Sequence, residues 1–373
     1  MHVVALNWRD LANPLGGGAE IHMEEILRHL GRRGHRCTLL TSRFPGAARD
    51  EQADGYRILR GGGEYTFNLA APGMLRRVMR ADPADVVLDD VNKIPLYSPL
   101  YSRAPVVAVV PHLMGASVFH EVNPLLATAV FAAEQPVRFV YRHCHFEVIS
   151  ESTRDELVAR GWEPERITVV HCGIDRETYQ PAATREKPGG PPRLVFVGRL
   201  KRYKFVDHAI RLVARLRAAH PGVTLTIVGS GDGRPDFEAL VRTLGAGDAV
   251  RFAGFVSTEE KVRLLQDAHV LVNPSLKEGW GLTNVEASAC GTAVVAADVP
   301  GLRDSVLHGR TGLLYPHGDL DALAAATDRL LRDPDERRRM EAEGLRWADS
   351  LTWARCGDET LALIERVVAG HRR

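Results

Sequence analysis

The sequence lacks an apolar segment long enough to cross a lipid bilayer. Its longest apolar stretches cover residues 104–110 and 124–133, whereas a membrane-spanning helix needs about 20 apolar residues. It also lacks an excess of charge of either sign, because 48 Lys and Arg residues balance 47 Asp and Glu residues to a net charge of +1. This balance excludes general electrostatic attraction to nucleic acid, so we expect no nucleic-acid partner and only a local anion site.

Cysteine is scarce as well. The five cysteines form no C-x-x-C pair and lie at Cys37, Cys144, Cys172, Cys290 and Cys356, which favours free thiols in a reducing cytosol. The first nine residues have no basic segment ahead of a long apolar run, so we expect no signal peptide. We therefore expect a cytoplasmic protein whose membrane contact, if any, is peripheral and at the inner face.

The sequence offers no set of residues typical of a metal site. His143, Cys144 and His145 are adjacent, and adjacent side chains of an extended segment point to opposite faces. Asp89 and Asp90 do not form a D-x-D motif, and a strand end is the favoured interpretation. We expect neither a metal nor a bound cofactor.

Length and hydrophobic patterning predict two α/β domains. The 373 residues exceed what one hydrophobic core usually organises, and in both halves short apolar runs alternate with segments of helical period, as in parallel sheets built from βαβ units. We expect doubly wound Rossmann-like domains over residues 1–182 and 193–350, with both sheets parallel. The segment 181–192 is rich in Pro and Gly, and residues 183–192 are expected to form an exposed linker. Such sheets bind ligands at the carboxyl ends of their strands, so we expect the site in a cleft between the domains.

The strongest local motif covers residues 274–286. Glu278 and Glu286 stand eight residues apart, two glycines follow closely after the first, and a helix is expected to begin between them. Glycine allows close approach of a ligand, and free N–H groups at a helix start favour phosphate. The motif favours a nucleotide sugar, with carboxylates that accept hydroxyl protons. An alternative stays open, because Thr283 and Glu286 also match a capping box in which Glu286 only bonds the Thr283 backbone.

A second group of charges follows a predicted strand at 194–197. Arg199 comes directly after a glycine, and Lys204 lies five residues further on. A guanidinium fork with a compact ammonium is well suited to a diphosphate. Lys201, in contrast, is interpreted as part of an ordinary solvated basic loop.

The first half contributes two weaker signals. Gly16, Gly17 and Gly18 link the first strand to the first helix and would present backbone N–H groups to a ligand. His112 follows the apolar strand at 106–110 and is expected to face the cleft.

Together these motifs resemble glycosyltransferase family 4, which comprises retaining enzymes of the GT-B fold. The family's E-x7-E is matched by Glu278 and Glu286, its G-R-L-x-x-x-K by residues 198–204 and its G-G-x-E by residues 17–20. The chain departs from the family where Phe205 replaces a common glycine, Trp280 a common Phe, and Cys172 a common Asn.

The resemblance implies a role for each matched residue. His112, Glu278, Arg199 and Lys204 would be the catalytic residues, with Arg199 and Lys204 on the diphosphate, Glu278 on the donor sugar and His112 near the transferred sugar. Glu286 would bind the ribose hydroxyls. Further donor contacts are implied for the backbone of Gly17 and Gly18, for the base-bordering strand that ends at Phe252, and for Gly279, Trp280, Gly281, Leu282 and Thr283. The stretch 351–368 resembles the helix that crosses back to the first domain.

The resemblance also implies a reaction. A hexose-type sugar would pass, with retention, from a nucleotide-diphosphate sugar to an acceptor hydroxyl, while an oxygen of the leaving phosphate takes the acceptor proton on the same face without a metal. A UDP-sugar is favoured over a GDP-sugar. The acceptor is not identified and is a glycan, a lipid-linked molecule or a small metabolite. Two alternatives stay open, a nucleotide-sugar epimerase of the same architecture and a non-catalytic nucleotide-sugar-binding protein.

Overall fold

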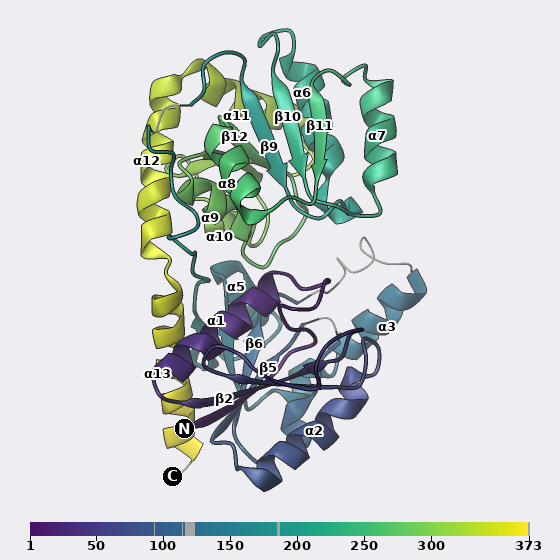
Figure 1. The fold of residues 1–373 in the computed structure, drawn as a ribbon, viewed down its shortest axis with the longest axis vertical. Coiled ribbons are helices and arrows are strands. Elements are labelled where there is room, and N and C mark those ends of the chain that lie inside the picture. The colour runs from purple at the N-terminus through teal and green to yellow at the C-terminus, as the bar shows by residue number, and fades with distance from the viewer. Residues whose placement is uncertain (93, 114, 116–123, 185–186, 372–373) are drawn as a thin grey trace. The chain divides into compact units, whose positions relative to one another are not determined.

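The computed structural model describes residues 1–92, 94–113, 115, 124–184 and 187–371. The chain divides into two compact units, Met1–Gly173 with Trp353–Arg373, and Ile174–Thr352. Each unit contains one sheet with helices packed on it, as Figure 1 shows.

In the described part of the first unit, eight strands form one sheet in the order β3-β4-β2-β1-β5-β6-β7-β8. The β1 and β6 strands, with the sequences HVVAL and VVAVV, are buried along their whole length, as expected for strands covered by helices on both faces. The strands are β1 (His2–Leu6), β2 (Arg36–Ser42), β3 (Asp50–Gln52), β4 (Arg57–Gly61), β5 (Val86–Asp90), β6 (Val106–Val110), β7 (His145–Val148) and β8 (Ile167–Val169).

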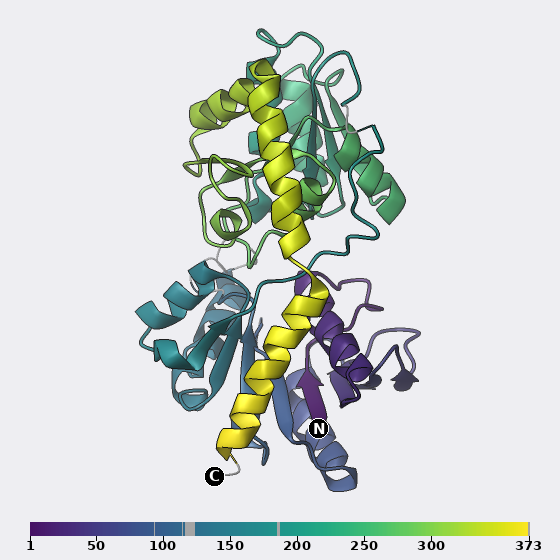
Figure 2. The same cartoon turned by 90° about the vertical axis from the view of Figure 1, so that its left-hand side faces the viewer.

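Helices cover both faces of this sheet. On one face, Leu30 of α1 and Leu363 of α13 share a core with Val3 of β1, and Figure 2 shows α13 running across that face. On the other face, Leu75 of α2 packs in a core with Val4. The helices are α1 (Gly18–Arg32), α2 (Phe67–Ala81), α3 (Pro124–Glu134), α4 (Val137–Val140), α5 (Glu151–Ala159) and α13 (Trp353–His371).

One edge of the first sheet corrects the expectation that both sheets are parallel throughout. The short strand β3 pairs antiparallel with β4. The chain reverses between them in a tight turn, in which the Ala53 N–H donates to the Tyr56 carbonyl at 2.8 Å and Gly55 has a φ of 86°. Its sequence, Asp-Glu-Gln, is fully exposed, so no apolar pattern marked it as a strand.

In the second unit, the described residues form a six-stranded parallel sheet in the order β11-β10-β9-β12-β13-β14. The strands are β9 (Arg193–Val197), β10 (Thr224–Val228), β11 (Val250–Gly254), β12 (Val270–Asn273), β13 (Ala293–Ala297) and β14 (Gly312–Tyr315). The helices are α6 (Val206–Leu216), α7 (Arg234–Thr243), α8 (Thr258–Asp267), α9 (Leu282–Ala289), α10 (Leu302–Ser305), α11 (Leu320–Arg332) and α12 (Pro334–Ser350). The α12 helix packs on α9, and α11 packs on α6.

The expected fold class, two doubly wound α/β sheets of the Rossmann type, is confirmed. The segment expected to link the domains contains no strand over residues 181–184 and 187–192, and its residues are half-buried or exposed. It belongs to the second unit. Lys187 fastens it there, because its Nζ donates to the Gln266 carbonyl at 3.0 Å and to Thr292 Oγ1 at 2.8 Å.

Two glycines of α13 test how tightly this helix packs on α1. A Cβ at Gly357 would lie 2.4 Å from the His29 ring, whereas a Cβ at Gly370 would meet nothing within 4 Å. We predict that Gly357→Ala lowers the free energy of unfolding by about 1–3 kcal/mol through overpacking. Gly370→Ala, the matched control, should raise it by up to about 1 kcal/mol, because alanine favours a helix.

Chemical denaturation of both variants measures the two changes. A stabilising effect at both positions would contradict the close packing of α13 on α1.

Candidate functional site

The second sheet reverses the direction of its strand order between β9 and β12. From β9 the order continues outward through β10 and β11, and from β12 it continues the other way through β13 and β14. Open parallel sheets bind ligands outside the carboxyl ends of their strands at such a switch point. The loop after β9 carries Arg199 and Lys204, and the loop after β12 carries Glu278.

The two loops are joined by an ion pair. Lys204 Nζ donates to Glu278 Oε1, and the two side chains are only 14% and 18% exposed. Burial alone would lower the pKa of Lys204, but the charge and hydrogen bond of Glu278, together with the charge of Tyr203, outweigh it, and the pKa is raised. Arg199 is exposed and donates to the Tyr203 hydroxyl at 3.2 Å. Sequence-predicted residues from both sides of the switch point therefore lie together.

A glycine-rich loop after β10, which the sequence analysis missed, supports Arg199. The Leu200 N–H donates to the Ser230 carbonyl at 2.9 Å. A Cβ at Gly229 would lie 2.0 Å from the Gly198 carbonyl oxygen, so only glycine lets the two loops approach this closely. The signal in the sequence was a run of alternate glycines directly after a buried strand.

Glu286 does not form the capping box that the sequence left open as an alternative. The α9 helix begins at Leu282 after Gly281, whose φ of 77° lies in the left-handed region, so Thr283 is already inside the helix and does not cap it. Glu286 Oε1 instead accepts from Lys261 Nζ at 2.9 Å, with the two side chains 12% and 22% exposed. The capping-box alternative is therefore wrong.

Two residues around Glu286 were not found from the sequence. Lys261 of α8 also lies over the Tyr179 ring, with its Nζ 4.9 Å from the ring centroid. Burial, and next the charge of Glu286, raise the pKa of Tyr179. Neither residue stands in a recognisable motif, because each comes from a separate element that only the fold brings to α9.

The segment between the two glutamates combines a buried anchor with an accessible backbone. The Trp280 side chain is 2% exposed, and its ring lies 6.5 Å from that of Trp347 on α12. Gly279, Leu282 and Thr283 are half-buried. The first N–H groups of α9 have no partner within the helix, and the Gly281 cap adds no side-chain acceptor. What Trp280 can offer a ligand is its main chain.

Phe205 occupies the position where the family commonly has glycine. Its φ of 48° lies in the left-handed region that glycine favours. Its ring packs 4.6 Å from His317 and 4.9 Å from His208, measured between ring centroids. This packing explains how a bulky residue is held in that conformation. At the sheet edge, the half-buried Phe252 of β11 lies under the Arg234 guanidinium at 5.6 Å.

The candidate residues of the first unit lie at the carboxyl ends of its strands. Gly17 and Gly18 lie at the start of α1, after β1, and the Gly17 N–H donates to Glu20 Oε2 at 2.7 Å. A Cβ at Gly17 would meet only that carboxylate, at 3.7 Å, so packing within the unit does not require glycine there. The half-buried His112 follows β6.

The acidic pair considered for a metal has structural partners. Asp89 is fully buried and accepts from the Tyr141 hydroxyl at 2.6 Å and from the Ser98 N–H at 3.1 Å. Within the described ranges, no group of three or more His, Cys, Asp and Glu side chains is arranged to hold a metal ion. No helix in the same ranges is long and apolar enough to cross a membrane.

Comparison with known families and proteins agrees with this architecture. Residues 16–178 match the family described as Glycosyltransferase Family 4, and residues 181–347 match the family described as Glycosyl transferases group 1. The chain is 30% identical over 401 aligned residues to alpha-maltose-1-phosphate synthase of Mycolicibacterium smegmatis, covering 98% of this chain and 100% of that protein. It is 33% identical over 241 residues to D-inositol 3-phosphate glycosyltransferase of Streptomyces bingchenggensis, covering 60% of this chain and 53% of that protein. The chain thus spans about half the length of the latter relative.

Solved structures share the fold. Sucrose-phosphate synthase from Thermosynechococcus elongatus aligns with a TM-score of 0.82 at 22% identity and covers 99% of both chains. Anabaena HepE in complex with UDP and glucose aligns with a TM-score of 0.77 at 17% identity, covering 98% of this chain and 100% of HepE. The two family matches and the relative aligned over its full length show that the chain belongs to the glycosyltransferases, a class of enzymes, and its fold is GT-B. At the level of this superfamily, the resemblance drawn from the motifs is confirmed.

A pair of glycines tests whether the Glu278 loop depends on close packing. Gly301 and Gly309 both have positive φ values, 81° and 74°, so alanine is strained at both, and the ψ of −43° at Gly301 lies outside the left-handed helical region and adds to the strain there. A Cβ at Gly301 would lie 2.1 Å from the Glu278 carbonyl oxygen, whereas one at Gly309 would meet nothing within 4 Å. We predict that Gly309→Ala costs about 1 kcal/mol of stability, and that Gly301→Ala costs clearly more and also displaces Glu278.

Thermal unfolding and turnover of the two variants measure the difference. Equal stability and equal turnover in both variants would contradict the close packing.

Proposed function

We propose that this glycosyltransferase moves a hexose-type sugar from a nucleotide-diphosphate sugar to an acceptor hydroxyl, with retention and without a metal. The observation that carries the proposal is the meeting of Lys204 and Glu278 across the switch point of the second sheet. A parallel sheet presents its ligand-binding loops there.

The cations around this point support a diphosphate as ligand. Arg199 offers an exposed guanidinium and Lys204 a largely buried ammonium. The start of α9, which has no side-chain cap, adds backbone N–H groups that favour anions. Guanidinium, ammonium and helix start would neutralise the leaving diphosphate with groups already in position.

The Lys204–Glu278 ion pair indicates an additional role for Glu278 in the unliganded protein. Before the donor binds, its carboxylate neutralises Lys204 inside a site that excludes most solvent. A diphosphate would take over Lys204 and free Glu278 to accept from sugar hydroxyls. The burial of Lys204 is then compensated in the unliganded protein, and the diphosphate has to displace the Glu278 carboxylate in order to bind.

Glu286 is proposed to bind the ribose. Lys261 and Tyr179 would fix its carboxylate, because Lys261 Nζ donates to one oxygen at 2.9 Å and the charge of Glu286 acts on the Tyr179 hydroxyl. Phe252 would border the base, and the backbone of Gly279, Trp280, Gly281, Leu282 and Thr283 would line the sugar and phosphates.

For the first unit, the matched motifs alone support the proposed contacts. Gly17 and Gly18 would close over the phosphates, and His112 would lie near the transferred sugar. In the reaction, the bond from sugar C1 to the diphosphate oxygen breaks, and the acceptor oxygen bonds C1 on the same face. The acceptor proton passes to the leaving phosphate, so no protein nucleophile is needed and the products are a glycosylated acceptor and a nucleoside diphosphate.

A UDP-sugar is the favoured donor, because HepE, which has the same fold, holds UDP and glucose. The names of the relatives contain inositol phosphate, maltose phosphate and sucrose phosphate. Sugars, inositol phosphate and sugar phosphates are therefore related to the proposed acceptors. A glycan, a lipid-linked molecule or a small metabolite is proposed as acceptor, with the protein in the cytoplasm and any membrane contact peripheral.

The donor proposal is tested by thermal unfolding with UDP-, GDP-, ADP- and dTDP-sugars, since a ligand of the native state raises the unfolding midpoint. UDP-sugars should raise it most. Arg199→Ala and Lys204→Ala should each weaken binding by about 1.5–3 kcal/mol, the range for hydrogen bonds to charged groups. Lys201→Ala is the matched control, because its Nζ pairs with the exposed Asp232 at 2.9 Å.

Equal losses in all three variants would mean that the basic loop acts only through its overall charge. No shift with any nucleotide sugar would overturn the proposed donor class.

The roles of the two glutamates can be distinguished by the part of the donor that each is proposed to bind. Glu286→Ala should weaken the binding of free nucleoside diphosphate and of donor alike, because both contain ribose. Glu278→Ala should leave the affinity for nucleoside diphosphate unchanged or higher, since Lys204 is released, and should lower turnover, because orientation of the sugar matters most in the transition state. Calorimetric titration and steady-state kinetics in EDTA measure these effects.

Loss of diphosphate binding in Glu278→Ala with retention in Glu286→Ala would reverse the two assignments. Turnover that EDTA abolishes and Mg²⁺ restores would contradict the metal-free reaction.

A further inference from the structure

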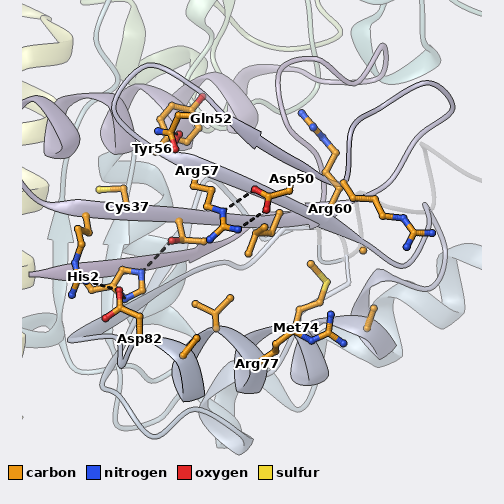
Figure 3. Close-up of a pocket in the computed structure, with 18 of the residues that line it drawn as sticks. His2, Cys37, Asp50, Gln52, Tyr56, Arg57, Arg60, Met74, Arg77 and Asp82 are labelled. Atoms are coloured by element: carbon orange, nitrogen blue, oxygen red, sulfur yellow. Dashed lines mark hydrogen bonds and ion pairs between the residues drawn. The ribbon is translucent and has the colours of Figure 1, made fainter.

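The first unit contains a groove of about 1050 Å³ between the strands β2 and β4 and the helix α2, shown in Figure 3. All of its lining residues lie between His2 and Asp82. None of the candidate donor-site residues lines it. The groove therefore belongs to one unit, and the proposed reaction does not use its lining residues.

The groove is strongly basic. Asp50 and Asp82 are its acidic lining residues, and both are already paired. Arg57 Nε donates to Asp50 at 2.7 Å, and Arg36 Nη1 lies 2.7 Å from Asp82. Against these two acids stand six lining arginines, Arg36, Arg43, Arg49, Arg57, Arg60 and Arg77.

Three of the arginines are not neutralised by the protein. Within the residues that the structure describes, Arg43, Arg49 and Arg77 have no carboxylate partner, and all three are exposed. Arg43 donates only to the Gly62 carbonyl, at 3.2 Å. Three arginines without acidic partners along one groove give it a positive potential, which favours a bound anion.

Arg60, in contrast, is neutralised within the protein. Its side chain is 1% exposed, and its Nε and Nη1 donate to Asp10 and Glu51, each at 2.6 Å. Its guanidinium also lies 5.5 Å from the centroid of the Phe44 ring. Arg60 therefore contributes to the wall of the groove, and the exposed arginines are the residues that can bind an anion.

The floor of the groove is apolar. Leu59, Met74 and Val78 are partly buried side chains that face it from β4 and α2. A Cβ at Gly61 would lie 2.4 Å from Met74 Sδ, so glycine allows the methionine to cover the strand. An apolar floor beneath a basic rim matches a ligand with an anionic head and an apolar portion.

We propose that this groove binds a phosphate-bearing amphiphile, with its phosphate on Arg49 and Arg77 and its apolar portion on Leu59 and Met74. The arginines would recognise a phosphate group, which either a lipid or a free phosphate or diphosphate could supply. The apolar floor favours the lipid phosphate.

Calorimetric titration of the full chain with octyl phosphate, inorganic phosphate and pyrophosphate tests the proposal. The double variant Arg199→Ala Lys204→Ala serves as the background, because it removes the phosphate ligands of the proposed donor site. We expect octyl phosphate to bind this background at one site, at least tenfold more tightly than inorganic phosphate. Loss of donor binding in the background together with retained octyl phosphate binding distinguishes the two sites.

Rim variants localise the site. In the same background, Arg77→Gln and Arg49→Gln should each weaken octyl phosphate binding at least fivefold. Arg76→Gln should leave it unchanged, since Arg76 is an exposed neighbour on α2 that does not line the groove. Unaltered unfolding midpoints would show that the variants are folded.

Absence of octyl phosphate binding in the background would overturn the proposal, as would equal losses for Arg76→Gln and Arg77→Gln. Tighter binding of pyrophosphate than of octyl phosphate would overturn the amphiphile and assign the groove to a free diphosphate.

Discussion

Parallel strands place all their following loops at one edge of a sheet, and the reversal of strand order between β9 and β12 decides which of these loops meet. Arg199 and Lys204 come from one side of the reversal, and Glu278 and α9 come from the other. The loops approach closely because glycines stand where any side chain would clash, at Gly229 against Gly198 and at Gly301 against Glu278. The geometry of the candidate site is thus a consequence of backbone packing and not of the charged residues themselves.

The charged residues then balance one another in the unliganded protein. Each of the two glutamates of the E-x7-E motif pairs with a lysine from another element, Glu278 with Lys204 and Glu286 with Lys261. Burying one member of such a pair without the other would be costly. The proposed ligand, with its diphosphate and hydroxyl groups, would offer both Lys204 and Glu278 new partners at once. The Lys204–Glu278 pair would then be exchanged for contacts with the ligand, whereas Lys261 would keep Glu286 in position for the ribose.

The sequence allowed the two sheets and the motif residues to be predicted, because buried parallel strands are continuous apolar runs and the motifs are local. Other features arise only from contacts between distant elements. Lys261 reaches Glu286 through the packing of α8 near α9, and β3 is a polar strand that pairs only because a tight turn returns it to β4. Glu286 was compatible with two local structures, and the left-handed Gly281 decided between them by starting α9 before Thr283. The arginine-lined groove could not be predicted, because its residues are spread over four strands and a helix.

The central claim is that the switch point of the second unit binds the diphosphate of a nucleotide sugar. A crystal structure of the protein with UDP tests it most directly. The account predicts that the diphosphate lies within hydrogen-bonding distance of Arg199, Lys204 and the first turn of α9, with the ribose hydroxyls at Glu286 and the Lys204–Glu278 pair opened. UDP bound elsewhere, or bound there with the Lys204–Glu278 pair intact and the ribose away from Glu286, would contradict it.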